Sequence, residues 1–524
     1  MLAHDADVII IGAGHNSLTA ALYLQRAGLK TLTVELADSP GGAAKTGEVT
    51  EPGYKHDLFA TNIGLFMGSR VYSDFKDDLH KQGFGVVASE RPFASVFPGE
   101  KCLRVYQDAE KTSREISRFS TTDARAWADM INYFNQVAPY LFPLLQMQMP
   151  SVKLIGQLWK MYRKLGQSET HELFRLLIKS PKGFLNERYE SDEIKALLAP
   201  WAFHLDFGPD VAGGATFSFL ESSADHCNGM AFSRGGVGNL INAMVATIEA
   251  KGGKLIYGQK VTRIIVKNGT VVGVKMGDGR NLSAKKGVIA NVTPNQLVNL
   301  IEPKELPDSY AQKARRYRFG PGTMMIHIAL DKPLVWNADR ELTNFAYIHA
   351  GPYIEDISMA YNQASSGYLP ASPMLVVAQQ SVIDPTRAPQ GKHVLWVQVR
   401  ALPAKPKGDT MGAITSNRWE EIKEKYCERV IDKIALYASN IKDIIRQIYI
   451  YSPQDLENEN PNLVGGDNVG GSHHLDQNFL FRPFSGWSNY KTPIKRLFMT
   501  GAATWPGGGL NATSGYLAAS QLIK

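Results

Sequence analysis

Cysteine is scarce in this chain, and its scarcity excludes two classes of small, cross-linked fold. The 524 residues contain only Cys102, Cys227 and Cys427, an odd number at wide spacing. A disulfide framework needs several paired cysteines, and a zinc finger needs cysteines at short intervals. We therefore expect three free, buried thiols and a reducing compartment, which predicts a cytoplasmic location.

Long apolar runs are also missing. No stretch reaches the roughly 18 apolar residues that a membrane-spanning helix requires. The residues before the first predicted strand, "MLAHDA", are too short and too polar for a secretory signal. We expect a protein that is soluble or attached only to the surface of a membrane.

A strong charge of one sign and several catalytic motifs are absent as well. Lys plus Arg number 57 and Asp plus Glu number 50, which gives a net charge of +7 without a long basic run. This mild excess predicts no nucleic-acid partner, although it leaves an anionic membrane surface open. The chain has no H-E-x-x-H, P-loop, G-x-S-x-G or C-x-x-C motif, so hydrolase, kinase and dithiol reductase functions are excluded and no metal site is predicted.

What the chain does have is a dinucleotide-binding pattern near its start, "DVIIIGAGHNSLTAALYLQRAGLKTLTVE". "DVIII" is a continuous apolar, β-branched run, which is typical of a strand buried on both faces of a parallel sheet. The next residues carry apolar side chains at helical spacing, and "KTLTVE" predicts a second strand. Strand, glycine turn, helix and strand indicate a Rossmann-like α/β domain.

Each residue of the pattern has an expected part in holding a nucleotide. Gly12 permits the tight turn, Gly14 lets the backbone approach a pyrophosphate, and the small Ser17 stands where a third glycine allows close packing of helix and strand. Glu35 ends the second strand at the spacing where a carboxylate accepts hydrogen bonds from an unphosphorylated adenosine ribose. The alternative is an ordinary strand–turn–helix unit without a ligand.

Further motifs resemble the FAD-dependent phytoene-desaturase-like oxidoreductases, especially the pyridine nucleotide-disulfide oxidoreductase domain-containing relatives. The chain shows "GAGHNSL", "GGAAKT", "EPGYKHD" and "GAATWPGGG" in the family's order, with Ser17 in place of glycine and Trp505 in place of histidine. The resemblance is close over roughly the first 70 and last 60 residues. It implies FAD as cofactor, held in part by Gly41, Gly42, Val261, Gly501, Ala502, Gly507, Gly508, Gly509 and Leu510. For Val261, a generic strand residue is an equal alternative.

The closing segment "WPGGGLNATSGYLAAS" supports this assignment on physical grounds. Glycines let a backbone come close to a flat ring, so Gly507, Gly508 and Gly509 are expected beside the isoalloxazine. A helix predicted to begin near Asn511 would direct its positive end toward the part of the flavin that becomes anionic on reduction.

The resemblance implies that both ends of the chain meet on one FAD, so the cofactor domain is discontinuous. We expect residues 1–70, 231–315 and 470–524 to form the FAD-binding domain, and residues 71–230 and 316–469 to form a substrate domain. The first part of the substrate domain has a helical pattern, whereas "TMMIHIALDKPL", "MLVVAQQSVI" and "HVLWVQVRAL" predict strands of a second, mixed sheet.

One segment of the predicted helical region combines large apolar side chains with basic ones. Residues 134–166 contain Phe, Leu, Met and Trp together with Lys153, Lys160, Arg163 and Lys164. The segment could lie on a membrane surface or form the mouth of an apolar tunnel. It could equally be a helix pair with a solvated basic face.

Few catalytic side chains are needed where a flavin does the chemistry. His473 and His474 are candidates for acid or base because imidazole titrates near neutrality, with surface-loop histidines as the alternative. Asp57 resembles the family's aspartate near the flavin, or else it caps a turn. Asp225 lies beside His226 and Cys227, but the three lack metal-ligand spacing.

The sequence thus predicts an FAD-dependent oxidoreductase that moves hydride from a largely apolar substrate to flavin N5 and passes electrons to oxygen, a quinone or another acceptor. One alternative is an amine or amino-acid oxidase, with Trp505 and Tyr516 as an aromatic cage and Arg482 as the carboxylate ligand. A second alternative is a lipid-escort protein that uses the same fold without flavin.

Overall fold

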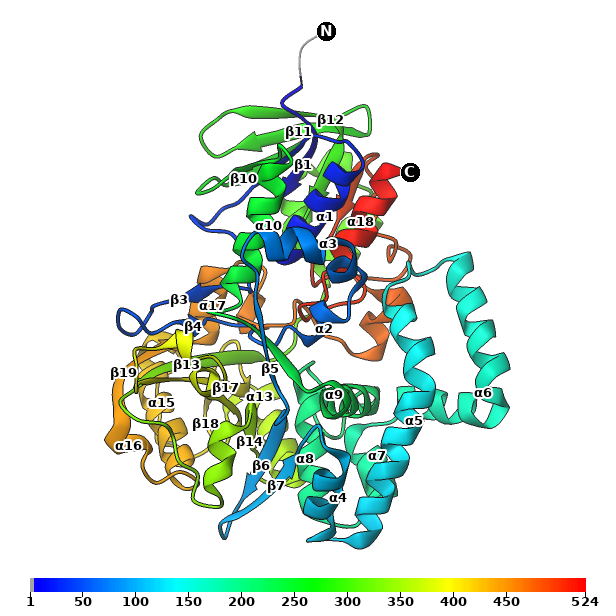
Figure 1. The fold of residues 1–524 in the computed structure, drawn as a ribbon. Coiled ribbons are helices and arrows are strands. Elements are labelled where there is room, and N and C mark those ends of the chain that lie inside the picture. Colours follow the sequence, from blue (N-terminus) through cyan, green and yellow to red (C-terminus); the bar gives the residue numbers. More distant parts are fainter. Residues whose placement is uncertain (1–3) are drawn as a thin grey trace.

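The first of two large sheets carries the N-terminal strand of the chain. The computed structural model describes residues 4–524 (Figure 1). Five strands run parallel in the order β20-β12-β1-β2-β9, and β10 and β11 extend the sheet antiparallel from β12. The strands are β1 (Ala6–Ile11), β2 (Thr31–Val34), β9 (Lys254–Ile256), β10 (Val261–Lys267), β11 (Thr270–Met276), β12 (Asn281–Ala290) and β20 (Leu497–Met499).

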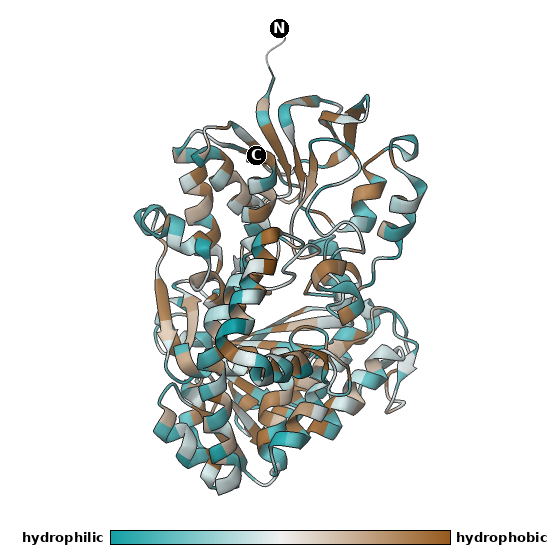
Figure 2. Ribbon diagram, turned by 90° about the vertical axis from the view of Figure 1, so that its right-hand side faces the viewer, coloured by the Kyte–Doolittle hydropathy of each residue, from teal (hydrophilic) through white to brown (hydrophobic). Residues whose placement is uncertain are grey.

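Buried helices cover this sheet. α1 (His15–Arg26) follows β1 and packs against both α10 (Gly238–Ala250) and α18 (Thr513–Ile523). Figure 2 shows apolar residues running along the strands of this upper sheet. The strand–turn–helix–strand prediction for the N-terminal pattern is confirmed, as is the predicted helix just after Asn511.

The second sheet is antiparallel except for one parallel pair, β14 and β6, so it is mixed as expected. α15 (Trp419–Ala435) packs against one face, and the helices α8 (Asp192–Phe203) and α9 (Ala215–Asn228) contribute to the core on the other. In spatial order the strands are β19 (Ile445–Tyr451), β13 (Gly322–Leu330), β17 (His393–Leu402), β16 (Met374–Ala378), β14 (Tyr347–Ala350), β6 (Phe93–Phe97) and β7 (Lys101–Val105).

The prediction of a helical region from 71 to 230 is wrong for residues 86–105. These residues form β5 (Val86–Ser89), β6 and β7, and β5 pairs with β8 (Met230–Ser233). Every residue of β6 is buried, so the strand lacks the polar–apolar alternation that marks a half-buried strand. The rest of the region is helical: α3 (Arg70–Lys81), α4 (Ala109–Ser117), α5 (Thr121–Leu145), α6 (Val152–Ile178) and α7 (Pro181–Arg188), followed by α8 and α9.

Shorter elements complete the fold. They are β3 (Thr46–Gly47), β4 (His56–Asp57), α2 (Gly64–Met67), α11 (Pro294–Asn299), α12 (Asp308–Arg315), α13 (Ile354–Ser365), β15 (Tyr368–Leu369), α14 (Gln380–Ile383), β18 (Gly408–Asp409), α16 (Ile441–Ile444) and α17 (Pro453–Glu459). Among residues 4–524, no helix is both long and apolar enough to cross a bilayer. Cys102, Cys227 and Cys427 carry free thiols; Cys102 and Cys427 are buried as expected, whereas Cys227 is partly exposed.

The strands divide between the sheets in a simple way along the chain. Every strand of the first sheet falls within residues 1–70, 231–315 or 470–524, and every strand of the second within 71–230 or 316–469. We keep the division of the chain at these boundaries as a proposal. The region where the two sheets face each other holds the site described next.

Candidate cofactor and substrate site

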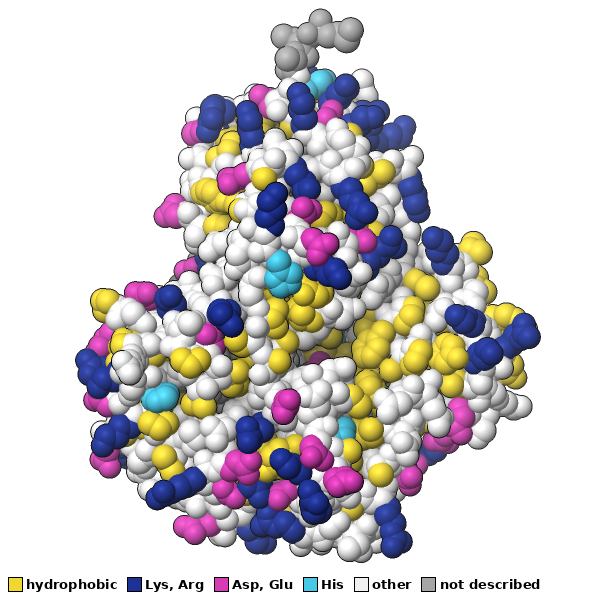
Figure 3. Space-filling model, in the orientation of Figure 1, with side chains coloured by type: hydrophobic (Ala, Val, Ile, Leu, Met, Phe, Trp, Pro, Cys, Tyr) yellow, Lys and Arg dark blue, Asp and Glu magenta, His cyan; other side chains and the backbone are white. Residues whose placement is uncertain are grey.

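A cavity of about 1770 Å³ extends from the carboxyl ends of the parallel strands to the second sheet. Figure 3 shows a hollow between the upper and lower parts of the molecule, with hydrophobic side chains around its rim. Residues that end or follow β1, β2, β12 and β20 line its upper part, including Ile11, Glu35, Asn291 and Thr500. In open α/β sheets this edge is where nucleotides bind.

The glycine turn after β1 forms one wall of the cavity. Gly12 adopts a φ of +89°, which L side chains rarely accept, and Gly14 is the N-cap residue of α1. The N-terminal N–H groups of a helix attract anions. Gly41 and Gly42 lie opposite, because Gly41 forms a bridge with Gly14 and its N–H donates to Ala13 O at 2.9 Å. The turn, Gly41 and Gly42 therefore line one wall together at the N-terminus of α1, where a pyrophosphate is expected.

Glu35 lies where the sequence places it, at the end of β2 and on the cavity wall. Its carboxylate accepts from Ala13 N at 2.5 Å and from Ala37 N at 2.9 Å. Each oxygen can accept more than one hydrogen bond. Glu35 therefore holds the glycine turn in place and retains acceptor capacity for a ribose hydroxyl.

Ser17 is fully buried and does not line the cavity. Its hydroxyl accepts from Asn291 Nδ2 at 2.9 Å, and Asn291 does line the cavity. A Cβ on Gly501 would clash with Asn291 Oδ1, so that glycine makes room for the asparagine. Sequence reasoning missed Asn291, although its place directly after the buried strand β12 was a usable signal.

The C-terminal loop forms the part of the wall beside the start of α1. Ala502, Gly508, Gly509 and Leu510 line the cavity, whereas Gly507 does not. A Cβ on Gly508 would lie 2.9 Å from Val469 O, so close packing within the protein is one reason for this glycine. Val261, the first residue of β10, also lines the cavity.

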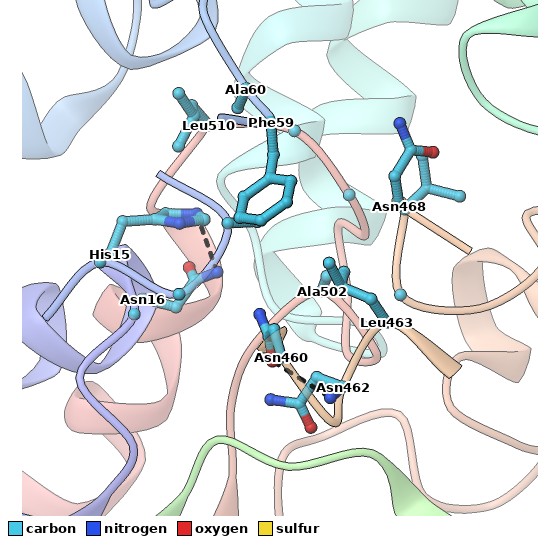
Figure 4. Close-up of a pocket in the computed structure, with 18 of the residues that line it drawn as sticks. His15, Asn16, Phe59, Ala60, Asn460, Asn462, Leu463, Asn468, Ala502 and Leu510 are labelled. Carbon is cyan, nitrogen blue, oxygen red and sulfur yellow. Dashed lines mark hydrogen bonds between the residues drawn. The ribbon is translucent and has the colours of Figure 1, made fainter. Parts of the chain in front are cut away.

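His15 and Asn16 are two cavity residues that lie within the N-terminal motif but were given no part from sequence. Figure 4 shows them beside Leu510, joined by a hydrogen bond of 3.0 Å between His15 Nε2 and Asn16 Nδ2. Burial lowers the pKa of His15 to about 4, so the ring is neutral near pH 7. A neutral ring adds no positive charge beside the N-terminus of α1, which is already the positive end of the helix dipole.

The candidate acid–base residues lie outside the cavity lining. Asp57 is fully buried and accepts from Thr46, Thr61, the backbone of Val237 and Arg387. His473 is buried and accepts from Gly508 N at 3.0 Å, and desolvation holds its pKa well below the usual value. His474 lies 3.6 Å from an oxygen of Asp206. These contacts support positioning parts, and a catalytic part for any of the three stays a prediction.

The residues expected for an amine or amino-acid oxidase site are also absent from the lining. Arg482 donates to the carbonyl groups of Ser472, Gly470, Gly471 and Ala502, so it fixes backbone loops. Trp505 is buried and donates to Met147 O, while Tyr516 packs against Tyr23.

The lower part of the cavity reaches the second sheet and has a mixed wall. Aromatic and apolar side chains dominate it, with a few polar groups among them. Tyr347 and Trp396 stack with their planes only 5° apart. The polar groups are His204, Glu221, Asp225, Gln398, Arg400 and Asn468. Among the described residues, no cluster of three or more His, Cys, Asp or Glu is arranged to hold a metal.

Comparison with known proteins identifies the group that this cavity accommodates. Residues 18–413 match the family model described as flavin containing amine oxidoreductase. The chain belongs to this family. Its glycine turn, its α1 N-terminus and its strand-end carboxylate fit FAD, and the protein is an FAD-dependent oxidoreductase of the phytoene-desaturase-like group.

Curated relatives match nearly the whole oxidoreductase chain. Pyridine nucleotide-disulfide oxidoreductase domain-containing protein 2 of Rattus norvegicus is 26% identical, over 100% of this chain and 94% of that protein. A limonene dehydrogenase polypeptide of Castellaniella defragrans is 27% identical, over 99% and 94%. Phytoene desaturase (lycopene-forming) of a Paracoccus species is 23% identical, over 98% and 96%.

A solved structure shows the same fold. The oxidoreductase from Methanosarcina mazei superposes with a TM-score of 0.60, covering 98% of this chain and 99% of that one at 18% identity. The fold class expected from sequence, a Rossmann-like FAD-binding domain with a mixed-sheet and helical substrate domain, is confirmed.

Proposed function

We propose that the protein is a dehydrogenase or desaturase that removes hydride from a largely apolar substrate. The observation that carries this proposal is the continuity of one cavity from the nucleotide motif to a wall of apolar side chains. Phe59, Phe142, Leu145, Met325 and Trp396 all contribute to that wall. FAD supplies the hydride acceptor when bound. The names of the limonene and phytoene relatives support an apolar substrate.

The part of the protein in this proposal is to bind, orient and exclude water. Large apolar surfaces hold a hydrocarbon by removing it from water, at roughly 25 cal/mol for each Å² buried. The neutral His15 and the backbone of Gly508 and Gly509 lie at the upper end, where the flavin ring is expected. The electron acceptor in this proposal is oxygen or a quinone.

Anaerobic reduction of the bound flavin tests the substrate class. We expect a panel of terpenes and polyenes to bleach the visible flavin absorbance, with amines and amino acids without effect. Bleaching by amines alone would favour the amine oxidase alternative. A purified protein that binds no FAD would revive the escort alternative and contradict the proposal.

We further propose that α6 and the end of α5 rest on an anionic membrane surface, from which an apolar substrate enters. Val152, Ile155 and Trp159 on α6 are exposed by 86%, 68% and 61%. Lys153, Lys160, Arg163 and Lys164 lie in the same helix, so basic groups accompany the apolar ones. Figure 3 shows both kinds of side chain at the right-hand edge, where α6 lies in Figure 1. Leu145, which ends α5, lines the cavity.

Vesicle co-sedimentation tests this surface. We expect binding to vesicles that contain phosphatidylserine and weaker binding to phosphatidylcholine alone. Ile155→Ser with Trp159→Ser should reduce binding, whereas Met411→Ser, another exposed apolar residue on the substrate domain, should not. Equal sedimentation of all three proteins would contradict the proposal.

A further inference from the structure

Arg400 is a buried cation on the wall of the substrate cavity. It lies in β17 and is only 6% exposed. Its Nη1 donates to Asn468 Oδ1 at 2.8 Å and its Nη2 donates to His204 O, while its Nε has no hydrogen-bond partner. Within the described residues, no carboxylate oxygen lies within 4.0 Å of its guanidinium nitrogens, so Arg400 forms no salt bridge. Asp467, Glu221 and Asp206 lie near enough to act on its charge, but none of them forms a salt bridge with it. A buried charge without a directly paired counter-ion is costly unless a ligand supplies one.

The other buried arginines of the chain are compensated, which makes Arg400 distinctive. Arg387 pairs with Asp57 and Asp384, and Arg104 pairs with three carboxylates. Arg482 has no carboxylate partner, but its guanidinium donates to four backbone carbonyl groups, and its side chain does not line the cavity. Of these four arginines, only Arg400 lines the cavity.

Two tryptophans and two carboxyl groups line the same cavity as Arg400. The indole Nε1 atoms of Trp201 and Trp396 have no partner among the described residues, and both tryptophans line the cavity. Glu221 and Asp225 occupy successive turns of α9 on the cavity wall. Burial raises the pKa of Glu221 to about 8 and that of Asp225 well above its usual value. Glu221 is therefore largely protonated near pH 7, and its carboxyl group can then donate a hydrogen bond.

We propose that the cavity binds a terminal carboxylate of an otherwise apolar substrate, with Arg400 as its counter-ion. The inference rests on the dehydrogenase function proposed above and narrows its substrate class to apolar carboxylic acids. Guanidinium is suited to this task because its planar N–H groups match the two oxygens of a carboxylate. The substrate's apolar body then extends along the wall toward Phe59 and the flavin end of the cavity.

Binding of simple probes to the FAD-loaded, oxidised protein tests the inference without turnover. Decanoate and 1-decanol share an apolar chain and differ in the charged head group. We expect calorimetry to show decanoate binding at least tenfold more tightly than 1-decanol at pH 7, because a charge-assisted pair contributes roughly a 10- to 100-fold difference. Equal affinity of the two probes overturns the inference, whatever the behaviour of any variant.

Substitution of Arg400 assigns the preference to this side chain. Arg400→Gln should abolish the preference for decanoate, and Arg400→Lys should retain part of it. Arg446→Gln, which removes an arginine of the same sheet outside the cavity lining, should leave it intact. Variants are compared only at equal flavin content. A preference that survives in Arg400→Gln overturns the assignment.

A pH series gives a second readout. Ionisation of Glu221 above about pH 8 would repel a bound carboxylate, so decanoate affinity should fall between pH 7 and pH 9 while 1-decanol affinity stays level. Other titratable groups that act on Arg400 or Glu221 are His204, Asp206, Asp225, Tyr347 and Asp467, and His349 acts on His204. Asp467 is already engaged by the backbone N–H groups of Gly320, Val469 and Gly471. Decanoate affinity that rises with pH contradicts the inference.

The two proposals fail separately. Flavin bleaching by hydrocarbons without a preference for decanoate removes only the carboxylate site. A decanoate preference without bleaching by any hydrocarbon or apolar acid removes the dehydrogenase function and leaves the binding site standing.

Discussion

Ser17 departs from the three-glycine pattern, and its contacts explain why serine is accepted there. The hydroxyl faces Asn291 within the protein, so it does not meet the nucleotide. Gly501 in turn has no room for a Cβ beside that asparagine. Ser17 thereby holds the side chain of Asn291, which lines the cavity, in place. Glu35 acts similarly, since it ties the turn at Ala13 to the end of β2.

Substitution of Glu35 should release FAD. Glu35→Gln loses a charged acceptor, and such hydrogen bonds contribute about 1.5 to 3 kcal/mol, so we expect FAD affinity to fall by roughly one to two decades. Flavin retention after dilution and gel filtration measures the effect. Glu249→Gln, an exposed change of equal charge on α10, is the control. Full flavin retention by Glu35→Gln would remove its assignment to the ribose.

Glu221 should make the stability of the protein depend on pH. Its folded-state pKa is raised to about 8 from an ordinary value of 4.5, so the folded protein holds a proton that the unfolded chain has lost. Stability from this group is therefore present at low pH and is lost as pH rises through about 8, by at most about 1.4 kcal/mol per pH unit. Melting temperatures should fall from pH 6.5 to pH 8.5, and less steeply in Glu221→Gln. The exposed Glu420→Gln should keep the original slope.

The glycine-rich start of α10 is bound by side chains of the protein itself and does not form a nucleotide site. The segment "RGGVGNL" spans the start of this helix, and the N–H groups of Val237 and Gly238 donate to Asp57 and Thr46. Asp57 also pairs with Arg387, and both side chains are fully buried. The first N–H groups of α10 therefore have acceptors within the protein. The ion pair of Asp57 with Arg387 joins this helix start to residues 316–469.

Asp57→Asn should destabilise the protein strongly. The substitution leaves the buried Arg387 with Asp384 as its one carboxylate partner among the described residues, so we expect a loss of about 3 kcal/mol, the lower end of the range for breaking a buried ion pair. Urea unfolding followed by fluorescence measures it. Asp331→Asn breaks exposed ion pairs with Lys392 and Arg446 and should cost about 1 kcal/mol or less. If both substitutions lowered the free energy of unfolding by the same small amount, the buried ion pair of Asp57 would not be important for stability.

The C-terminal loop should respond to added volume at Gly508. Valine there brings a Cβ to 2.9 Å from Val469 O, so the loop must move away from its neighbour. We expect Gly508→Val to lose or distort the flavin spectrum, with a drop in melting temperature no larger than that caused by loss of a ligand. Gly156→Val, where no atom lies within 4 Å, should keep the native spectrum. A native spectrum in Gly508→Val would place the loop away from the flavin.

The two sheets of the molecule have unequal capacity for nucleotides. Parallel strands with glycine turns occur in the first sheet, whereas the second is almost entirely antiparallel. Helix N-termini at the carboxyl ends of parallel strands are what a Rossmann-type site requires. The part of the chain that the structure describes thus offers one such site, and the family assigns it to FAD.

NADH and NADPH should therefore reduce the flavin only slowly. Stopped-flow absorbance under anaerobic conditions should show a rate that rises linearly with nucleotide concentration, as expected for a collision without a binding site. Rapid reduction that saturates would reveal a nicotinamide site and contradict this prediction.

Local pattern was sufficient for the cofactor half of the molecule. A buried strand, a glycine turn and an acid at a fixed spacing encode their own geometry, because each depends on neighbours within a few residues. Asn291 escaped notice because its contacts, with Ser17 and Gly501, join segments hundreds of residues apart in sequence. Within the region from 86 to 105, β6 escaped notice because burial on both faces removes its alternation.

Sequence alone thus predicted the Rossmann-like unit and the FAD family resemblance, since these depend on short-range spacing. Tertiary packing established the substrate cavity. β17, α8 and α9 bring Arg400, His204 and Glu221 to one wall, and no local pattern marks any of them. Packing also distinguished Arg482, bound to backbone carbonyls, from Arg400, which lacks a counter-ion, because desolvation and partners are properties of the folded chain.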